Sequence, residues 1–137
     1  MTELEEIRER YERGELDPIK RDLVNFVRAK GAAIRKFKSD FNAKNPRTPL
    51  TDETAIKFYI LKARSINPAG EIQEQLQEIE KEKWIRGEKT GHAPDPYEVA
   101  TDWARKYSPG WRSHRVTTII YVFERDKDAY IRLLNGK

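Results

Sequence analysis

Residues 84–115 read WIRGEKTGHAPDPYEVATDWARKYSPGWRSHR and hold all three tryptophans and both histidines of the chain. Aromatic side chains bury large areas and dominate the energetics of protein cores. We therefore expect the helices of this protein to converge on residues 84–115, with Trp84 and Trp103 in the interior.

The composition outside this stretch favours one helical domain. The chain has 137 residues, of which 37% are hydrophobic and 36% are charged. This length suits one domain, and so high a charged fraction suits amphipathic helices with charged outer faces. The sequence predicts an all-α fold, a single compact domain of five or six helices over residues 1–137. Residues 1–14 would form a short, peripheral N-terminal helix.

Capping residues and prolines mark where these helices begin. Thr2 with Glu5 forms a capping box, and Asp17-Pro18 places an N-cap before a first-turn proline. The predicted helices begin near Thr2, Asp17, Thr51, Ala69, Asp95 and Ser108. The second would run to about Asn42 and contain Gly31, which a close helix crossing would explain. The fourth would end at Gly91, because glycine adopts the left-handed cap at little cost.

Two segments are ambiguous between helix and strand. Residues 57–61 form a short apolar run, and residues 115–123 read RVTTIIYVF, rich in β-branched and aromatic side chains. Apolar residues nevertheless keep helical spacing from Val116 to Leu134 without a turn signal. We favour one long final helix, and the alternative is an α+β fold with a C-terminal strand near residues 116–123.

The predicted core follows from the apolar stripes of these helices. It comprises the stripe over residues 26–41, the helix over 56–61, Trp84, Trp103 and the helix over 116–134. Residues 55–61 are apolar on nearly every side, so we expect the third helix to be the most buried.

Trp84, Glu88, Gly91, Asp102 and Trp103 form the pattern W-x3-E-x2-G-x10-D-W. Over this stretch of the chain the sequence resembles short all-helical domains of unknown function in bacterial proteins. The resemblance implies an all-helical module, implies no activity and transfers no functional residue.

Candidate catalytic groups are few. Glu88 and Asp102 could form a pair of carboxylates for acid–base chemistry, but binding an arginine or capping an amide is the more frequent use of such residues. Glu88, His92 and Asp95 carry metal-ligand atoms, yet a helix ending at Gly91 would separate the first two. Neither Ser108 nor Ser113 lies in a nucleophile-elbow pattern. We therefore expect no catalytic residue, no metal and no cofactor.

Charge is strongly segregated along the chain. Residues 1–17 carry a net charge of −4, residues 18–47 carry +7 and residues 71–82 carry −4. The candidate binding residues of the basic segment, which runs from Lys20 to Arg47, are Lys20, Arg28, Arg35, Lys36 and Lys38. Such a face could contact phosphates, whereas the more common explanation is a solvated face or one packed on the acidic segment.

A second basic cluster interleaves cations with aromatic rings. Arg105, Arg112 and Arg115 surround Trp111, whose ring could stack on a base or hold an acidic peptide. A core position for Trp111 is the favoured interpretation.

The function favoured by these observations is a non-catalytic interaction or regulatory module. It would present charged helix faces to another macromolecule, most plausibly a protein or a second copy of itself. The alternative is a small nucleic-acid-binding protein that uses the face from Lys20 to Arg47, and an enzyme using Glu88 and Asp102 ranks third. The acidic N-terminus, the absence of cysteine and the lack of an apolar run of about 18 residues predict a cytoplasmic location and no membrane partner.

Overall fold

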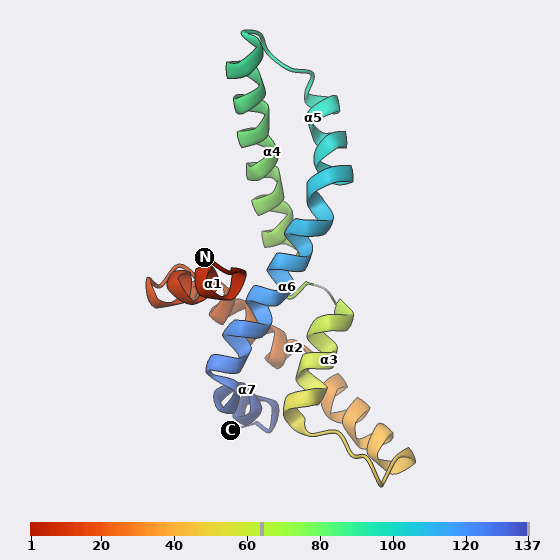
Figure 1. Cartoon of the computed structure of the whole chain (residues 1–137). Coiled ribbons are helices and arrows are strands. Elements are labelled where there is room, and N and C mark those ends of the chain that lie inside the picture. Colours follow the sequence, from red (N-terminus) through yellow and green to blue (C-terminus); the bar gives the residue numbers. More distant parts are fainter. Residues whose placement is uncertain (64, 137) are drawn as a thin grey trace. The chain divides into compact units, whose positions relative to one another are not determined.

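The computed structural model describes residues 1–63 and 65–136, and every regular element in them is a helix (Figure 1). The elements are α1 (Glu3–Glu12), α2 (Asp17–Lys44), α3 (Asp52–Ala63), α4 (Pro68–Thr90), α5 (Pro96–Asp102), the π-helical η1 (Trp103–Tyr107), α6 (Ser108–Arg125) and α7 (Lys127–Leu134). The all-α prediction is confirmed. The strand alternatives at residues 57–61 and 116–123 are wrong, because both segments lie within helices.

Six continuous helical rods make up the described residues, because α5, η1 and α6 follow one another without a break. The number agrees with the five or six helices predicted. Contacts divide the chain into two units, Met1–Ile66 with Val116–Lys137 (unit 1) and Asn67–Arg115 (unit 2). The boundary at Arg115 falls inside α6. The prediction of one domain over residues 1–137 stays a prediction, and each unit is described by itself.

Most helices begin close to the predicted positions, and at most of these a side chain caps the first turn. The Glu5 amide donates to Thr2 Oγ1 at 3.2 Å, and the Tyr97 amide donates to Asp95 Oδ1 at 3.0 Å. Helix α2 differs, since it includes Asp17 and follows Leu16 without a side-chain cap. Its last residue is Lys44, two residues beyond the predicted end.

The final helical region is interrupted once. The backbone of Asp126 leaves the helical conformation with φ −130°, and α7 restarts at Lys127. This break lets the ring of Phe123 in α6 stack on Tyr130 in α7, with centroids 5.6 Å apart. The single long final helix is therefore corrected to two helices, α6 and α7, separated by a turn at Asp126 that the helical spacing of apolar residues did not signal.

Helix α6 begins at Ser108, as the Ser108-Pro109 signal predicts, but it follows η1 without a break. The Ser108 amide donates to the carbonyl of Trp103, five residues back, and this is the hydrogen bond of a π-helical turn. Proline has no amide hydrogen and is tolerated where the regular helical ladder is already interrupted. Helix α6 thus continues directly from η1.

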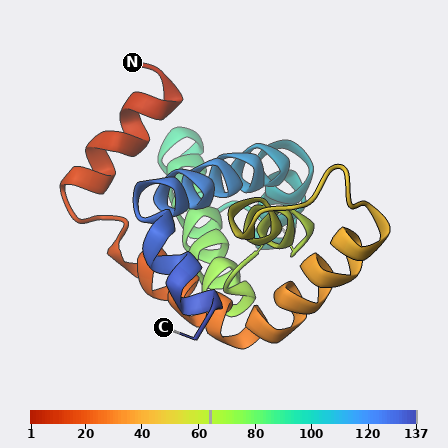
Figure 2. The ribbon, with the colours of Figure 1, turned by 90° about the horizontal axis from the view of Figure 1, so that it is seen from below.

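The hydrophobic core of unit 1 joins five helices around one cluster. Sixteen buried side chains form it, and Phe123 is the largest of those that are fully buried. Helix α1 contributes Ile7, which is fully buried although most of that helix is exposed. Gly31 of α2 is buried near Leu134 of α7, whose Cδ1 would lie 4.0 Å from an added Cβ. The close crossing predicted at Gly31 is therefore confirmed, and Figure 2 shows α2 and α7 together.

Residues 84–115 do not hold the core, which corrects the prediction made from the tryptophans. Trp84 is 67% exposed, Trp103 and Trp111 are half-buried, and Val99 is the one fully buried apolar side chain in this stretch. In unit 2 these rings lie on paired helices, which shield only the sides that face each other. The core of unit 1 instead draws its apolar stripes from five helices.

Helix α3 is also less buried than predicted. Ala55, Ile56 and Ile60 are buried, whereas Phe58 and Leu61 are 43% and 53% exposed. The Phe58 ring stacks on Phe37 of α2 with centroids 4.9 Å apart. None of the helices in the described part of the chain has the length and apolarity needed to cross a bilayer.

Candidate interaction surface

Helix α4 is a rod of 23 residues with well-defined ends. Asn67 Oδ1 accepts a hydrogen bond from the Gly70 amide at 3.1 Å, and Pro68 occupies the first turn. Gly91 closes the other end with φ 74°, in the left-handed region that favours glycine, as the sequence predicted. Between these two ends α4 is uninterrupted, and it carries every residue of the surface described below.

Polar bonds fix the inner side of α4 within unit 2. Arg86 is bound to Glu82 at 3.1 Å and to Asp102 of α5 at 3.0 Å, and Glu82 in particular raises the pKa of the Arg86 guanidinium. Gln75 Oε1 accepts hydrogen bonds from Trp103 Nε1 at 3.5 Å and from Ser108 Oγ at 3.2 Å. The orientation of α4 relative to these neighbours is thus set by its polar side chains.

The first turn of α4 is joined to Arg115, in the first half of α6, by a buried ion pair. Glu71 is only 3% exposed, and its Oε1 lies 3.6 Å from Nε of Arg115. Arg115 Nη1 also reaches Glu74 Oε2 at 3.1 Å. A buried charge needs a partner of opposite sign, so this cluster holds the two chain segments together.

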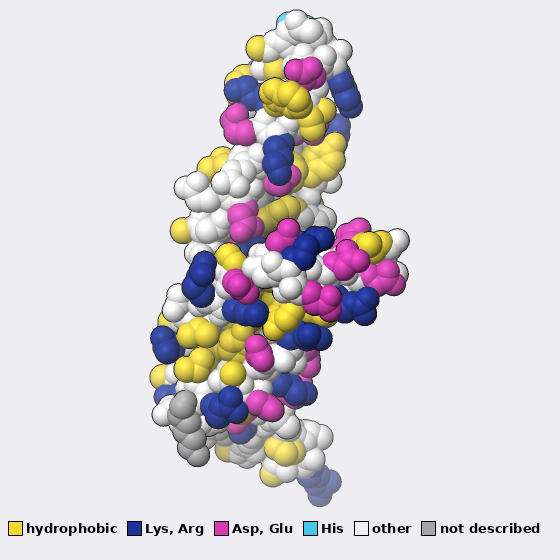
Figure 3. Space-filling view, turned by 90° about the vertical axis from the view of Figure 1, so that its left-hand side faces the viewer, with side chains coloured by type: hydrophobic (Ala, Val, Ile, Leu, Met, Phe, Trp, Pro, Cys, Tyr) yellow, Lys and Arg dark blue, Asp and Glu magenta, His cyan; other side chains and the backbone are white. Residues whose placement is uncertain are grey.

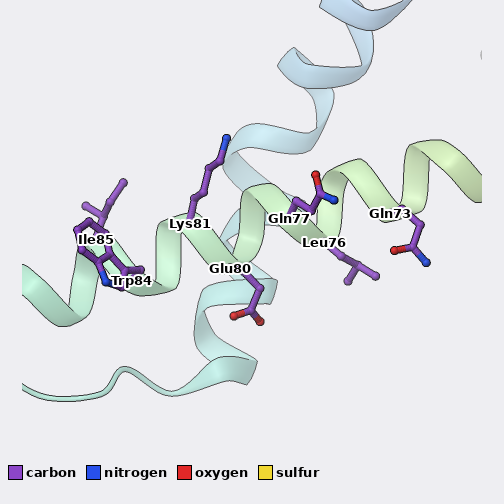
Figure 4. Close-up of a pocket in the computed structure, with 7 residues that line it drawn as sticks. All are labelled: Gln73, Leu76, Gln77, Glu80, Lys81, Trp84 and Ile85. Carbon is purple, nitrogen blue, oxygen red and sulfur yellow. The ribbon is translucent and has the colours of Figure 1, made fainter. Parts of the chain in front are cut away.

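The outer side of α4 is apolar at its centre and exposed. Leu76, Trp84 and Ile85 are 50%, 67% and 39% exposed. They line a shallow hollow of about 600 Å³ together with Gln73, Gln77, Glu80 and Lys81. Figure 4 shows these seven side chains projecting from successive turns of α4 alone. We call this set of seven residues the α4 outer face.

Trp84 also borders a second hollow of about 540 Å³ beside the loop that follows α4. Glu88 and His92 line it, which raises the question of catalysis. The imidazole Nδ1 of His92 lies 3.0 Å from the Thr90 carbonyl, so the ring is engaged with its own loop. Asp102 is bound to Arg86, as the arginine-binding interpretation anticipated.

Most of the predicted basic binding residues contact groups of their own unit. Arg35 donates to the Leu134 carbonyl at 2.6 Å and thereby caps α7. Ion pairs join Lys20 to Asp17 at 3.3 Å, Lys36 to Asp40 at 2.7 Å and Lys38 to Asp52 at 2.8 Å. The hydrogen bond from Lys38 lowers the pKa of Asp52, and that from Lys36 lowers the pKa of Asp40. These contacts neutralise part of the charge that the sequence assigned to binding.

The remaining predicted residues divide between the two units, with Arg28 in unit 1 and Arg105, Trp111 and Arg112 in unit 2. Arg28 and Arg105 are exposed, and Arg112 and Trp111 are half-buried. Arg28 lies with Lys20 and Arg21 along a groove of about 460 Å³ between α2 and α7. Tyr130 lines this groove, and burial raises the pKa of its hydroxyl to about 12.

Sequence reasoning missed the α4 outer face because it assigned Trp84 to the interior. The available signal was the distribution of apolar residues in α4, which fall on more than one side of the helix. Such a helix has more apolar surface than one neighbour can cover.

Within residues 1–63 and 65–136 no group of three or more acidic or histidine side chains is arranged to hold a metal ion. Comparison of the chain with protein-family models, with curated proteins and with solved structures finds no match. The resemblance of residues 84–103 to helical bacterial domains therefore stays an expectation.

Proposed function

We propose that this chain is a non-catalytic interaction module that binds a protein through the α4 outer face. The observation that carries the proposal is an exposed tryptophan flanked by exposed Leu76 and Ile85 on one continuous helix. Tryptophan is the residue most enriched among side chains that dominate binding energy, and contiguous exposed apolar patches mark interaction sites.

The surroundings of Trp84 match the anatomy of a protein interface. Glu80 and Lys81 lie within the same face, and hydrophobic side chains reach the surface among charged ones (Figure 3). An apolar centre with a charged rim is the usual arrangement at such interfaces. The polar bonds of Arg86 and Gln75 hold the other side of α4, so little conformational entropy would be lost on binding.

The contacts of Asp102 support a non-catalytic role. Arg86 Nη1 lies 3.0 Å from this carboxylate, so Asp102 is engaged in an ion pair within unit 2. Glu88 is exposed to solvent. The cytoplasm is the setting that the composition favours for such a module.

Site-specific photo-crosslinking tests the proposal. A photoreactive phenylalanine analogue replaces Trp84 in one variant and Tyr97, a 79% exposed residue of α5, in a matched control. Irradiation in cells that naturally express the chain should yield a protein adduct from position 84 and none from position 97. Equal adducts from both positions, or none from position 84, would overturn the proposal.

A second candidate function is nucleic-acid binding through α2. The observation that favours it is the groove in which Lys20, Arg21 and Arg28 meet, although Asp126 also lines this groove. Phosphate contacts of this kind weaken as salt rises. Anisotropy titration with random duplex DNA at low and high salt tests it, since binding at low salt should fall in the Arg21→Glu/Arg28→Glu variant. No binding at low salt removes this candidate.

A further inference from the structure

We propose that the groove between α2 and α7 binds a small organic anion, in which a single negative charge is joined to an apolar chain or ring. The site belongs to unit 1 and is independent of the α4 outer face. The observations that carry the proposal are two arginines without ion pairs, the apolar walls beside them and a buried hydroxyl group without a partner.

The groove has the size and the walls of a small-molecule site. It measures about 460 Å³ and lies between two helices that pack against each other, as Figure 2 shows. Val24 of α2 and Ala129 and Leu133 of α7 give it apolar walls, and all three side chains are half-buried. Small-molecule sites are concave and measure about 300 to 1,000 Å³, with mostly apolar walls and a few polar groups that orient the ligand.

Two cations of the groove have no anionic partner. Arg21 and Arg28 are exposed, and neither forms an ion pair with another described residue. They are seven residues apart, which places them on one side of α2 and about 10 Å apart along its axis. Lys20 differs, because it is paired with Asp17 at 3.3 Å and lies over the ring of Tyr11. An anion in the groove would therefore meet two guanidinium groups that no carboxylate of the described chain engages.

Asp126 limits the charge of the ligand. It also lines the groove, and it forms no ion pair with another described residue. The two unpaired arginines and this unpaired carboxylate leave the groove with a net charge of +1. A single negative charge balances the groove, whereas a row of phosphates along it would also face the carboxylate. Duplex DNA is therefore less suited to the groove than a small anion with one charge.

The position of Asp126 also indicates which end of the groove holds the negative charge. Gly31 of α2 lies against Leu134 of α7, and Arg28 is about one turn before Gly31. Asp126 comes eight residues before Leu134, which is about 12 Å along the direction of α7. The carboxylate is thus at the other end of the groove. We expect the anionic group beside Arg28 and the apolar body of the ligand along the apolar walls.

A buried hydroxyl group beside the groove also lacks a partner. Tyr130 lines the groove and is 3% exposed, and its hydroxyl forms no hydrogen bond with any described residue. Burial raises the pKa of this hydroxyl to about 12, so it keeps its proton at neutral pH and can donate it to a hydrogen bond. Buried polar groups are nearly always hydrogen-bonded, and a charged oxygen is a strong acceptor. An oxyanion in the groove would supply the acceptor that the described chain does not.

NMR titration of the purified full chain with three small molecules tests the site. Octanoate has the proposed charge and apolar chain, octanamide has a chain of the same length without the charge, and acetate has the charge without the long chain. Octanoate should bind with a Kd of about 0.1 to 1 mM and shift the amide signals of α2 and α7, because a shallow groove binds a small ligand weakly. Octanamide and acetate should each bind at least about tenfold more weakly, because each lacks one of the two required groups.

Matched arginine variants separate binding in the groove from a general attraction of anions to a basic chain. Arg28→Gln should raise the Kd of octanoate at least about fivefold, because it removes a charge-assisted hydrogen bond. Arg47→Gln changes an exposed arginine outside the groove and should leave the Kd within about twofold. Ala129→Leu should also raise the Kd, because the larger side chain fills the groove. Circular dichroism shows whether each variant keeps its helices, as expected for the two exposed arginines.

The outcomes are independent of the proposed function, which concerns α4. The absence of amide shifts at about 10 mM octanoate, well above the expected Kd, overturns the inference. Shifts confined to unit 2, equal binding of octanoate and octanamide, or equal effects of Arg28→Gln and Arg47→Gln overturn it as well. Duplex DNA that shifts the α2 amides where octanoate does not would overturn it and favour the nucleic-acid candidate.

Discussion

Units 1 and 2 are both helical, but they are stabilised in different ways. Unit 1 places sixteen buried side chains in one cluster, whereas Val99 is the one fully buried apolar side chain among the described residues of unit 2. Unit 2 relies instead on helix caps and on ion pairs such as Arg86–Asp102. The difference indicates that unit 1 is organised around one buried core, while unit 2 leaves apolar side chains such as Trp84 exposed.

The largest expected effect separates buried from exposed aromatic residues. Phe123 is fully buried in unit 1, so Phe123→Ala should lower the free energy of unfolding by about 3–5 kcal/mol. Trp84→Ala should change it by less than about 1 kcal/mol, because the ring is 67% exposed. Urea denaturation followed by circular dichroism measures both. Similar losses from the two substitutions would break the comparison between the units.

The ion pair at the start of α4 is the next test, and it concerns unit 2. Arg115→Met should leave Glu71 buried without its partner and cost about 3 kcal/mol locally. Hydrogen exchange should show faster exchange of the α4 amides. The double variant Glu71→Leu/Arg115→Met should recover much of the protection, because a buried apolar pair replaces the buried charges. Unchanged exchange in Arg115→Met would show that unit 2 does not depend on this pair.

Substitutions at Gly31 test how closely α2 and α7 pack in unit 1. Gly31→Leu should destabilise it by about 1–3 kcal/mol, because a large side chain cannot fit against Leu134 of α7. Gly31→Ala should change stability by less than about 1 kcal/mol. Its added Cβ would lie 3.3 Å from Arg35 Nη1, and better helix propensity offsets that contact. Thermal unfolding measures the stability of both variants. Equal losses of stability in Gly31→Leu and Gly31→Ala would argue against a close crossing.

The smallest expected effect is a pH dependence in unit 1. Lys38 lowers the pKa of Asp52 in the folded chain below its ordinary value of 3.8. The pair therefore contributes stability above about pH 4 that is lost as pH falls through the folded pKa. Asp52→Asn should remove about 0.5–1 kcal/mol at pH 7 and make the acid limb of stability shallower. An unchanged acid limb, measured by urea denaturation between about pH 2 and pH 6, would contradict this.

Local sequence signals were sufficient to predict the helices and most of their ends. Helices begin after Thr2 and Asp95, whose side chains accept hydrogen bonds from nearby amides, and α4 ends at Gly91 through its left-handed backbone angles. Each of these features involves only a few neighbouring residues. The break at Asp126 was missed because apolar residues keep helical spacing across it; in the structure it accompanies the stacking of Phe123 on Tyr130.

The placement of the candidate site could not be predicted in the same way. The sequence does not distinguish a buried tryptophan from an exposed one. In the structure Trp84 is exposed. Likewise, the cationic side chains of Arg35 and Lys38 looked free in the sequence. The structure pairs them with the Leu134 carbonyl and Asp52, which are 99 and 14 residues away.

The sequence by itself determined that this chain is all-α, where most helices begin and how charge divides along the chain, because these depend on neighbouring residues. Only the tertiary structure decided which apolar side chains became core. That choice depends on how many helices surround a position, and five surround the core of unit 1 while α4 keeps an open side. The exposed face carrying Trp84 is therefore a consequence of packing that no local pattern contains.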